Sequence, residues 1–126
     1  MFRVFIMVGV GGAAGSMLRY AIGLFFQRYF QPSFPFSTLF INLLGCLLIG
    51  FLFGLADKQA WMQGNVLLLL ATGFCGGFTT FSTFALENIG LIQQAQFFSA
   101  TFYSLLSVGL GLALCRLGMF IANATF

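Results

Sequence analysis

The chain of 126 residues consists of long uncharged stretches that are divided by single charged residues. Twenty-eight uncharged residues separate Arg28 from Asp57, 28 separate Lys58 from Glu87, and 28 separate Glu87 from Arg116. A helix needs about 20 predominantly apolar residues to cross the hydrocarbon core of a membrane. Each stretch is therefore long enough for one membrane-spanning helix with short connecting ends.

An earlier apolar stretch, which Arg19 interrupts, predicts one further span. The stretches lack the alternation of apolar and polar residues that is typical of a membrane β-barrel. The predicted fold class is an all-α integral membrane protein with four transmembrane helices in a single domain, 1–126. We expect the spans at about 3–26, 36–56, 65–90 and 96–120.

The first span also has features of a secretory signal peptide, since Arg3 precedes an apolar stretch and residues 13–15 are small. Apolar residues resume after Gly15, however, and Arg19 lies where a cleaved signal would be ending. We therefore expect this segment to remain as the first span.

The composition supports a lipid environment and excludes several functions. Hydrophobic residues make up 60% of the chain and charged residues 6%, against about 25% charged residues in a soluble domain. There is no His, and Asp57 and Glu87 are the only carboxylates, so His-ligated metal sites and proton relays lack their usual side chains. We expect no enzyme activity, because no nucleophile–base pair is visible. We also expect no nucleic-acid partner, because a net charge of +3 spread over the span ends is not a basic patch.

The cysteines indicate neither a disulfide framework nor a zinc site. All three lie inside predicted spans and have no paired short spacing: Cys46, Cys75 and Cys115. We interpret them as buried thiols that behave as small apolar side chains.

The orientation of the chain in the membrane is weakly specified. Three basic residues lie on the side of the two termini, and Arg28 and, depending on its depth, Arg19 lie on the other side. This is a small bias under the positive-inside rule. A single weakly biased orientation and insertion in both orientations, with antiparallel pairing, both stay open. A partner is expected on size alone, because four helices leave little interior for a permeation path.

Pairs of small residues four positions apart occur in every span, which favours close approach of helices. The pairs are Gly11 and Gly15, Gly50 and Gly54, Gly73 and Gly77, and Ser107 and Gly111. They predict tight packing, within the subunit or between subunits.

The third span holds the most informative residues. Gly73, Gly76 and Gly77 lie within five residues and precede Thr79 and Thr80, which makes a poor helix centre. A break here would free backbone carbonyls near mid-membrane, and such carbonyls can coordinate a hard cation such as sodium. The alternative is an unbroken helix whose glycines form a packing face.

Hydroxyl groups and phenylalanines alternate after these glycines. Phe81 and Phe84 are three residues apart and lie one turn from each other on neighbouring faces of a helix. Because the edge of an aromatic ring is positive, two edges that face a narrow path would stabilise a small anion. The alternative is that both rings fill lipid-facing or core volume.

The segment from Gly76 to Phe84, Gly-Gly-Phe-Thr-Thr-Phe-Ser-Thr-Phe, with Glu87 following, resembles the signature of the Fluc (CrcB-type) fluoride ion channel family. The resemblance extends to the length, the four spans, Leu18-Arg19-Tyr20 at the end of the first span, and Thr38 and Asn42 in the second. It implies a passive fluoride-selective channel that exports fluoride from the cytoplasm across the plasma (inner) membrane of a prokaryotic-type cell. It also implies an antiparallel, dual-topology homodimer with two pores and a structural sodium ion at the centre of the interface. Insertion in both orientations follows from the resemblance.

The resemblance further implies roles for individual residues. The expected fluoride pore is lined by Phe81, Phe84, Asn42, Ser82, Thr83, Tyr103 and Ser107. The expected sodium ligands are the backbone carbonyls of Gly76 and Thr79, and we predict a third helix that is broken near Gly76–Thr79.

Two other positions are notable in this resemblance. Arg19 matches the basic residue of an aqueous vestibule, although an arginine that snorkels from a helix end is the alternative. Gly111 stands where the polar track of the family commonly has a further serine. A water molecule or a neighbouring group would then replace that hydroxyl.

Neutral donors suit this ion, because fluoride is strongly hydrated and its water must be replaced inside an apolar path.

Two other function classes stay open. A small dual-topology proton-coupled multidrug exporter would use a carboxylate of the first span, which has none, so Glu87 is the only candidate. A membrane scaffold would have no need for hydroxyls among phenylalanines at mid-membrane. The sequence leaves open whether Glu87 caps a helix, pairs with a base such as Arg19 or reaches water.

Overall fold

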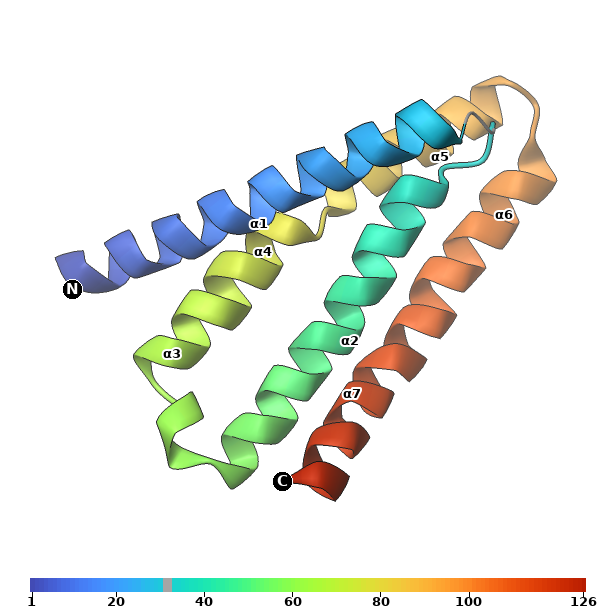
Figure 1. Ribbon diagram of the computed structural model, residues 1–126. Coiled ribbons are helices and arrows are strands. Elements are labelled where there is room, and N and C mark those ends of the chain that lie inside the picture. Colours follow the sequence, from blue (N-terminus) through green and yellow to red (C-terminus); the bar gives the residue numbers. More distant parts are fainter. Residues whose placement is uncertain (31–32) are drawn as a thin grey trace.

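The computed structural model describes residues 1–30 and 33–126, and these residues form a bundle of helices (Figure 1). Within the described part, four segments are long and apolar enough to span a membrane: Phe2–Tyr29, Phe36–Lys58, Asn65–Gln93 and Phe97–Thr125. The prediction of an all-helical membrane protein with four spans is therefore confirmed. Residues 31–32, which fall within the predicted first loop, lie outside the described part of the chain.

The first two spans are single helices, and the last two are composite. The first two are α1 (Phe2–Tyr29) and α2 (Phe36–Lys58), which a short 3₁₀ turn, η1 (Ala60–Met62), follows. The third span consists of α3 (Asn65–Leu67), the π-helical η2 (Leu68–Cys75), α4 (Gly76–Phe78) and α5 (Phe81–Gln93). The fourth consists of α6 (Phe97–Leu105), the π-helical η3 (Leu106–Leu110) and α7 (Gly111–Thr125).

The helices pack as two pairs, in which α1 lies along η2 and α4, and α2 lies along α7 (Figure 1). Glycines allow both contacts. A Cβ atom added to Gly73 would lie 2.9 Å from the carbonyl oxygen of Val8, and one added to Gly54 would lie 3.0 Å from the Cα of Met119. Because real Cβ atoms do not approach so closely, the glycine pairs in these two contacts bring backbone against backbone within the subunit.

The third span is broken at Thr79 and Thr80, which have extended backbone angles (φ −84°, ψ 158° and φ −150°, ψ 121°). The break is the one predicted, but Gly76 keeps helical angles (φ −63°, ψ −38°) and α4 continues through Phe78. The three glycines therefore lie before the break, and Gly73 and Gly77 pack against α1, as the alternative interpretation proposed for the glycines. The extended residues are two β-branched threonines, for which a helix restricts the side chain.

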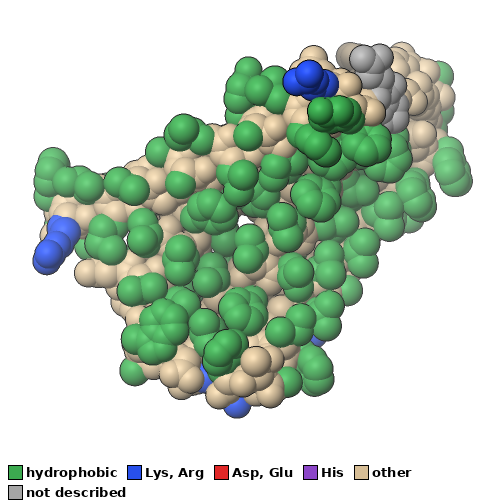
Figure 2. Space-filling view, in the orientation of Figure 1, with side chains coloured by type: hydrophobic (Ala, Val, Ile, Leu, Met, Phe, Trp, Pro, Cys, Tyr) green, Lys and Arg blue, Asp and Glu red, His purple; other side chains and the backbone are tan. Residues whose placement is uncertain are grey.

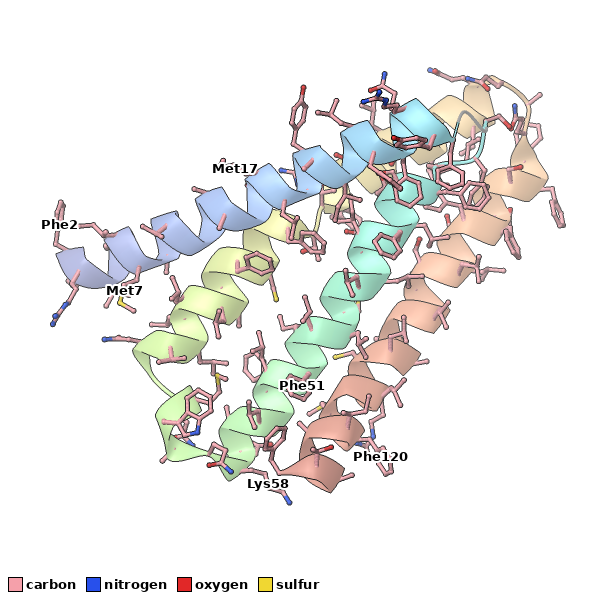
Figure 3. All side chains as sticks on the ribbon, in the orientation of Figure 1. Phe2, Met7, Met17, Phe51, Lys58 and Phe120 are labelled. Atoms are coloured by element: carbon pink, nitrogen blue, oxygen red, sulfur yellow. The ribbon has the colours of Figure 1, made fainter. Side chains whose placement is uncertain are left out.

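The buried apolar residues form two clusters, one at each end of α2. One cluster is built around Leu55, Met62 and Ala122, and the other around Leu39, Leu91 and Tyr103. At the first end, Lys58 Nζ also donates to the carbonyl oxygen of Asn123 at 3.0 Å, which ties α2 to the last turn of α7 (Figure 3). The break in the third span lies between the two clusters.

Large apolar side chains cover much of the outer surface, including Phe2, Met17, Phe81 and Phe98. Figure 2 shows hydrophobic side chains over most of one face, with Lys and Arg near its edges. Such a surface requires lipid or another protein chain as its environment.

Candidate functional site

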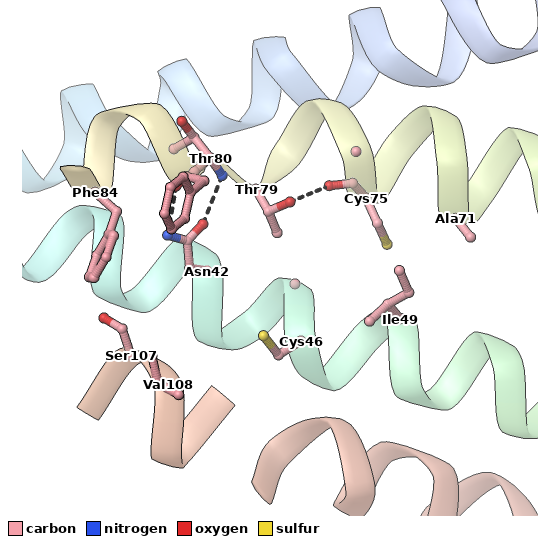
Figure 4. A pocket seen from close by; sticks show the side chains of 13 residues that line it. Asn42, Cys46, Ile49, Ala71, Cys75, Thr79, Thr80, Phe84, Ser107 and Val108 are labelled. Carbon is pink, nitrogen blue, oxygen red and sulfur yellow. Dashed lines mark hydrogen bonds between the residues drawn. The ribbon is translucent and has the colours of Figure 1, made fainter. Parts of the chain in front are cut away.

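The break in the third span is held by the side chain of Asn42 from α2 (Figure 4). Asn42 Nδ2 donates to the carbonyl oxygen of Thr80 at 2.9 Å, and Thr80 N donates to Asn42 Oδ1 at 2.8 Å. An amide side chain can make both bonds at once, because it carries an acceptor oxygen and a donor nitrogen. Asn42 Oδ1 therefore replaces the helical acceptor of Thr80 N, Asn42 Nδ2 adds a donor to Thr80 O, and the second amide hydrogen is left for another acceptor.

Thr80 is also the N-cap of α5. Its Oγ1 accepts a hydrogen bond from Thr83 N at 3.3 Å and donates one to Thr83 Oγ1 at 3.2 Å. It also shares a hydrogen bond of 3.4 Å with Ser82 Oγ. Ser, Thr, Asp and Asn are the residues that best satisfy the first amides of a helix. The predicted pore residues Ser82 and Thr83 thus belong to one hydroxyl cluster at the positive end of α5.

The break changes the bonding of several backbone carbonyls. Gly77 O accepts from Arg19 Nε at 3.1 Å and from Ser16 Oγ at 3.4 Å, and Thr80 O accepts from Asn42. In an unbroken helix, Gly76 O would accept from Thr80 N and Thr79 O from Thr83 N. Those two amides are instead bonded to Asn42 Oδ1 and Thr80 Oγ1.

Phe78 O, whose helical donor would be Ser82 N, is also released, and Gly76 O and Thr79 O are the two other released carbonyls without a donor among the described residues. These are the two carbonyls predicted to bind sodium. Within the described residues, no group of three or more Cys, Asp or Glu side chains could hold a metal ion. Carbonyl oxygens are a donor set that a hard cation accepts, so the residues present fit such an ion.

A pocket of about 350 Å³ lies beside the break, between α2, the third span and the fourth span (Figure 4). Four of the seven predicted pore residues line it: Asn42, Phe81, Phe84 and Ser107. Gly76 and Thr79 also line it. Among the described residues, its lining contains no charged side chain. The pocket is apolar, with a few neutral donors and a pair of aromatic rings.

The two phenylalanines form a pair at one edge of this pocket. The ring centroids of Phe81 and Phe84 are 5.7 Å apart, with an angle of 39° between the planes. Phe84 also packs against Tyr103, with 5.0 Å between centroids, whereas Phe81 is 79% exposed. Phe84 is thus fixed by its own subunit, and Phe81 has little packing there.

Tyr103 lies behind Phe84 and does not line the pocket. Its side chain is completely buried, and its hydroxyl donates to Glu87 Oε1 at 3.2 Å. Thr38, which is 6% exposed, lies beside the same two groups. The structure therefore identifies the partner of Glu87, which the sequence left open. The sequence indicated Thr38 only as part of the family resemblance.

Arg19 lines a second, smaller pocket of about 280 Å³ between α1, α2 and the start of α5. Ser37, Thr38, Thr80 and Thr83 contribute hydroxyl groups to the same pocket. Since Nε of Arg19 is bonded to Gly77 O, the guanidinium is held toward the break rather than extended to a helix end. Its other N–H groups can face the pocket.

The fourth span contributes Ser107 to the central pocket. Its Oγ is buried and has no hydrogen-bond partner among the described residues. Gly111, one turn later, is buried, and the nearest atom to a Cβ added there would be Cys46 Sγ at 3.3 Å. Cys46 lines the pocket as well, although the sequence had indicated only a small apolar role for it.

Comparison with known proteins gives matches over nearly the whole chain. Residues 6–119 match the model of a protein family described as CrcB-like protein, Camphor Resistance (CrcB). A protein of Azobacteroides pseudotrichonymphae, named fluoride-specific ion channel FluC, is 41% identical over 98% of both chains. A protein of the same name from Flavobacterium psychrophilum is 45% identical over 92% of this chain and 94% of its own length. Another, from Hydrogenobaculum sp., is 42% identical over 94% of this chain and 97% of its own length.

Proposed function

The chain belongs to the CrcB-like protein family, and from this membership and the geometry of the central pocket we propose that it is a passive, fluoride-selective channel. It is an integral, multi-pass protein of the plasma membrane, and its family is one of ion channels rather than enzymes. The transported ion is fluoride, which leaves the cytoplasm down its gradient.

One observation carries this proposal: the central pocket is lined by neutral donors and two phenylalanine rings, without a charged side chain among the described residues. Fluoride gives up its water only where other donors replace it. Asn42 has a spare amide hydrogen, and Ser107 has a buried hydroxyl without a partner. These groups can share the ion without the tight binding that a fixed cation would cause.

We further propose a structural sodium ion at the carbonyls of Gly76 and Thr79. The support is that the amides of Thr80 and Thr83, which would bond to these two carbonyls in an unbroken helix, bond to Asn42 Oδ1 and Thr80 Oγ1 instead. Both carbonyls belong to residues that line the pocket. When bound, the ion would neutralise the partial negative charge of the released oxygens. Two carbonyls are too few for a complete cation site, so a second set of ligands is needed.

An antiparallel homodimer, with two pores, supplies this second set in the proposal. Phe81 lines the pocket and is 79% exposed, which leaves one wall of the pocket open to a partner. The basic residues are distributed over both ends of the bundle, so insertion in both orientations is compatible with the charges. A second copy in the opposite orientation would bring its own Gly76 and Thr79 to the same ion.

The alternative of a proton-coupled multidrug exporter has less support. Its only candidate carboxylate for a central site, Glu87, is bonded to Tyr103 and does not line the central pocket. It faces a separate pocket near the end of the span, with Ser33 and Gln94. A carboxylate that exchanges protons with a transported cation would have to reach the transport path.

Ion efflux from liposomes tests the proposal. Purified protein is reconstituted into vesicles loaded with fluoride or chloride, and the external ion is followed with electrodes after valinomycin is added to vesicles that contain potassium. We expect rapid fluoride release and little chloride release, with no requirement for a proton gradient. Equal rates for the two anions, or release only with a proton gradient, would contradict a passive fluoride channel.

A further inference from the structure

The second and fourth spans face each other at two successive helical turns beside the central pocket, which Gly111 itself does not line. Asn42 and Cys46 are one turn apart on α2, and Ser107 and Gly111 are one turn apart on the fourth span. Asn42, Cys46 and Ser107 all line the pocket. Figure 4 shows Cys46 on α2, below Asn42 in this view.

At the turn that holds Cys46 and Gly111, the glycine has no side chain, and the sulfur of Cys46 lies next to the space that a side chain there would use. A Cβ at Gly111 would lie 3.3 Å from Cys46 Sγ, and no other atom beyond its chain neighbours and the nearby backbone of its own helix would lie within 4 Å of it. A contact at this distance is tighter than normal packing, so a side chain at 111 and the thiol at 46 compete for one space. The thiol thus occupies the place that a residue-111 side chain would have.

At the first turn, the wall has two polar groups with unused hydrogen-bonding capacity. These are the second amide hydrogen of Asn42 and the buried, unpartnered hydroxyl of Ser107. A buried polar group without a partner is costly, so both groups indicate that an acceptor enters the pocket at this level. Cys46 lines the same pocket one helical turn from Asn42.

We propose that Cys46 is an ion-facing wall residue of the fluoride path, whose thiol takes the place of a donor at Gly111 and influences the selectivity of the path. This inference rests on the proposed function. A thiol is a weaker hydrogen-bond donor than a hydroxyl. Fluoride gains more from a donor than the larger chloride ion does, so the residue at this level changes the ratio of the two fluxes.

The test is a double-mutant cycle in liposomes with four proteins: the unaltered chain, Cys46→Ala, Gly111→Ser, and both changes together. Cys46→Ala should reduce fluoride flux about fivefold, the effect of one lost weak bond to an ion. The double variant should return the flux to within about twofold of the unaltered chain, because the serine then has room and supplies a hydroxyl. Cys46→Ser should keep fluoride flux and raise the fluoride-to-chloride ratio.

Cys115→Ala is the matched control, because Cys115 does not line the pocket; its flux should equal that of the unaltered chain. Unchanged flux in Cys46→Ala would overturn the inference, and so would a double variant that loses as much as the two single variants combined. Either result would mean that Cys46 only packs between the helices and does not contact the ion.

Thermal unfolding of the same four proteins in detergent separates this inference from the proposed function. Gly111→Ser should lower the melting temperature by about 3 °C when Cys46 is present and should not lower it when residue 46 is alanine. Absence of this coupling would overturn the contact itself. If the unaltered chain carried no fluoride, the proposed function would fail, and the melting temperatures would still report on the contact.

Discussion

The side chain of Asn42 and the backbone of Thr80 exchange two hydrogen bonds, of 2.9 and 2.8 Å, between residues 38 positions apart in the chain. This pair joins α2 to the break in the third span. It also determines which carbonyls of the broken helix stay free, since the amide that would satisfy Gly76 O is bonded to Asn42 instead.

The first prediction concerns this pair. Asn42→Leu should lower the free energy of unfolding by about 2 kcal/mol, because it leaves the part-buried amide of Thr80 without its acceptor and removes one donor to Thr80 O. Thermal unfolding in detergent measures the loss, and Asn123→Leu on the exposed end of α7 is the control. Equal stability of the two variants would show that the break does not depend on the amide.

The second prediction concerns the contact of α1 with the third span. Gly15→Ala should destabilise the fold by about 2 kcal/mol through overpacking, because the new Cβ would lie 2.8 Å from Phe78 N. Gly9→Ala is the control, since nothing lies within 4 Å of a Cβ there. It should be neutral or stabilising by up to about 1 kcal/mol through helix propensity. A destabilised Gly9 variant would contradict this account of the packing.

The third prediction tests whether Arg19 acts through its hydrogen bond to Gly77 O or through its charge alone. Arg19→Lys keeps the positive charge but loses the Nε donor to Gly77 O, so fluoride flux should fall about tenfold if the guanidinium orients the break. Arg3→Lys, near the start of α1, should leave flux unchanged. If Arg19→Lys conducts as well as the Arg3 variant, charge alone is what Arg19 contributes.

The fourth prediction concerns Tyr103 and Glu87. Because the hydroxyl faces Glu87 rather than the pocket, Tyr103→Phe should lower the free energy of unfolding by about 1.5 kcal/mol. The loss should be much smaller when Glu87 is already leucine, which offers no acceptor, and a double-mutant cycle measures this difference. Tyr20→Phe, at a side chain that is 69% exposed, is the control. Additive losses from the two substitutions would show that the bond contributes nothing to stability.

The fifth prediction tests the aromatic pair. Phe81→Ile should reduce fluoride flux about tenfold by removing the ring edge, while leaving the stability of the subunit nearly unchanged because Phe81 is 79% exposed there. Phe84→Ile should reduce flux as well and should also destabilise, because its ring packs on Tyr103. Phe98→Ile, at 82% exposure, is the surface control. Normal flux in both pocket variants would assign the rings to packing.

The sequence predicted the fold well because membrane insertion depends on composition over long stretches. Four uncharged or nearly uncharged runs of more than 20 residues allow few other structures. The glycine pairs predicted close packing for a different, local reason: the spacing of four residues places both members on one helix face. The family signature from Gly76 to Phe84 predicted the family, and the match of residues 6–119 to the family model confirms it.

The sequence alone predicts four spans, a segment that resists a regular helix, and a group of neutral donors beside phenylalanines. The contacts among these elements depend on the tertiary structure. It placed the break at Thr79 and Thr80, because Asn42 from another span bonds there. It put Tyr103 behind Phe84 and Cys46 in the space beside Gly111, because those contacts join helices whose relative rotation no local pattern specifies.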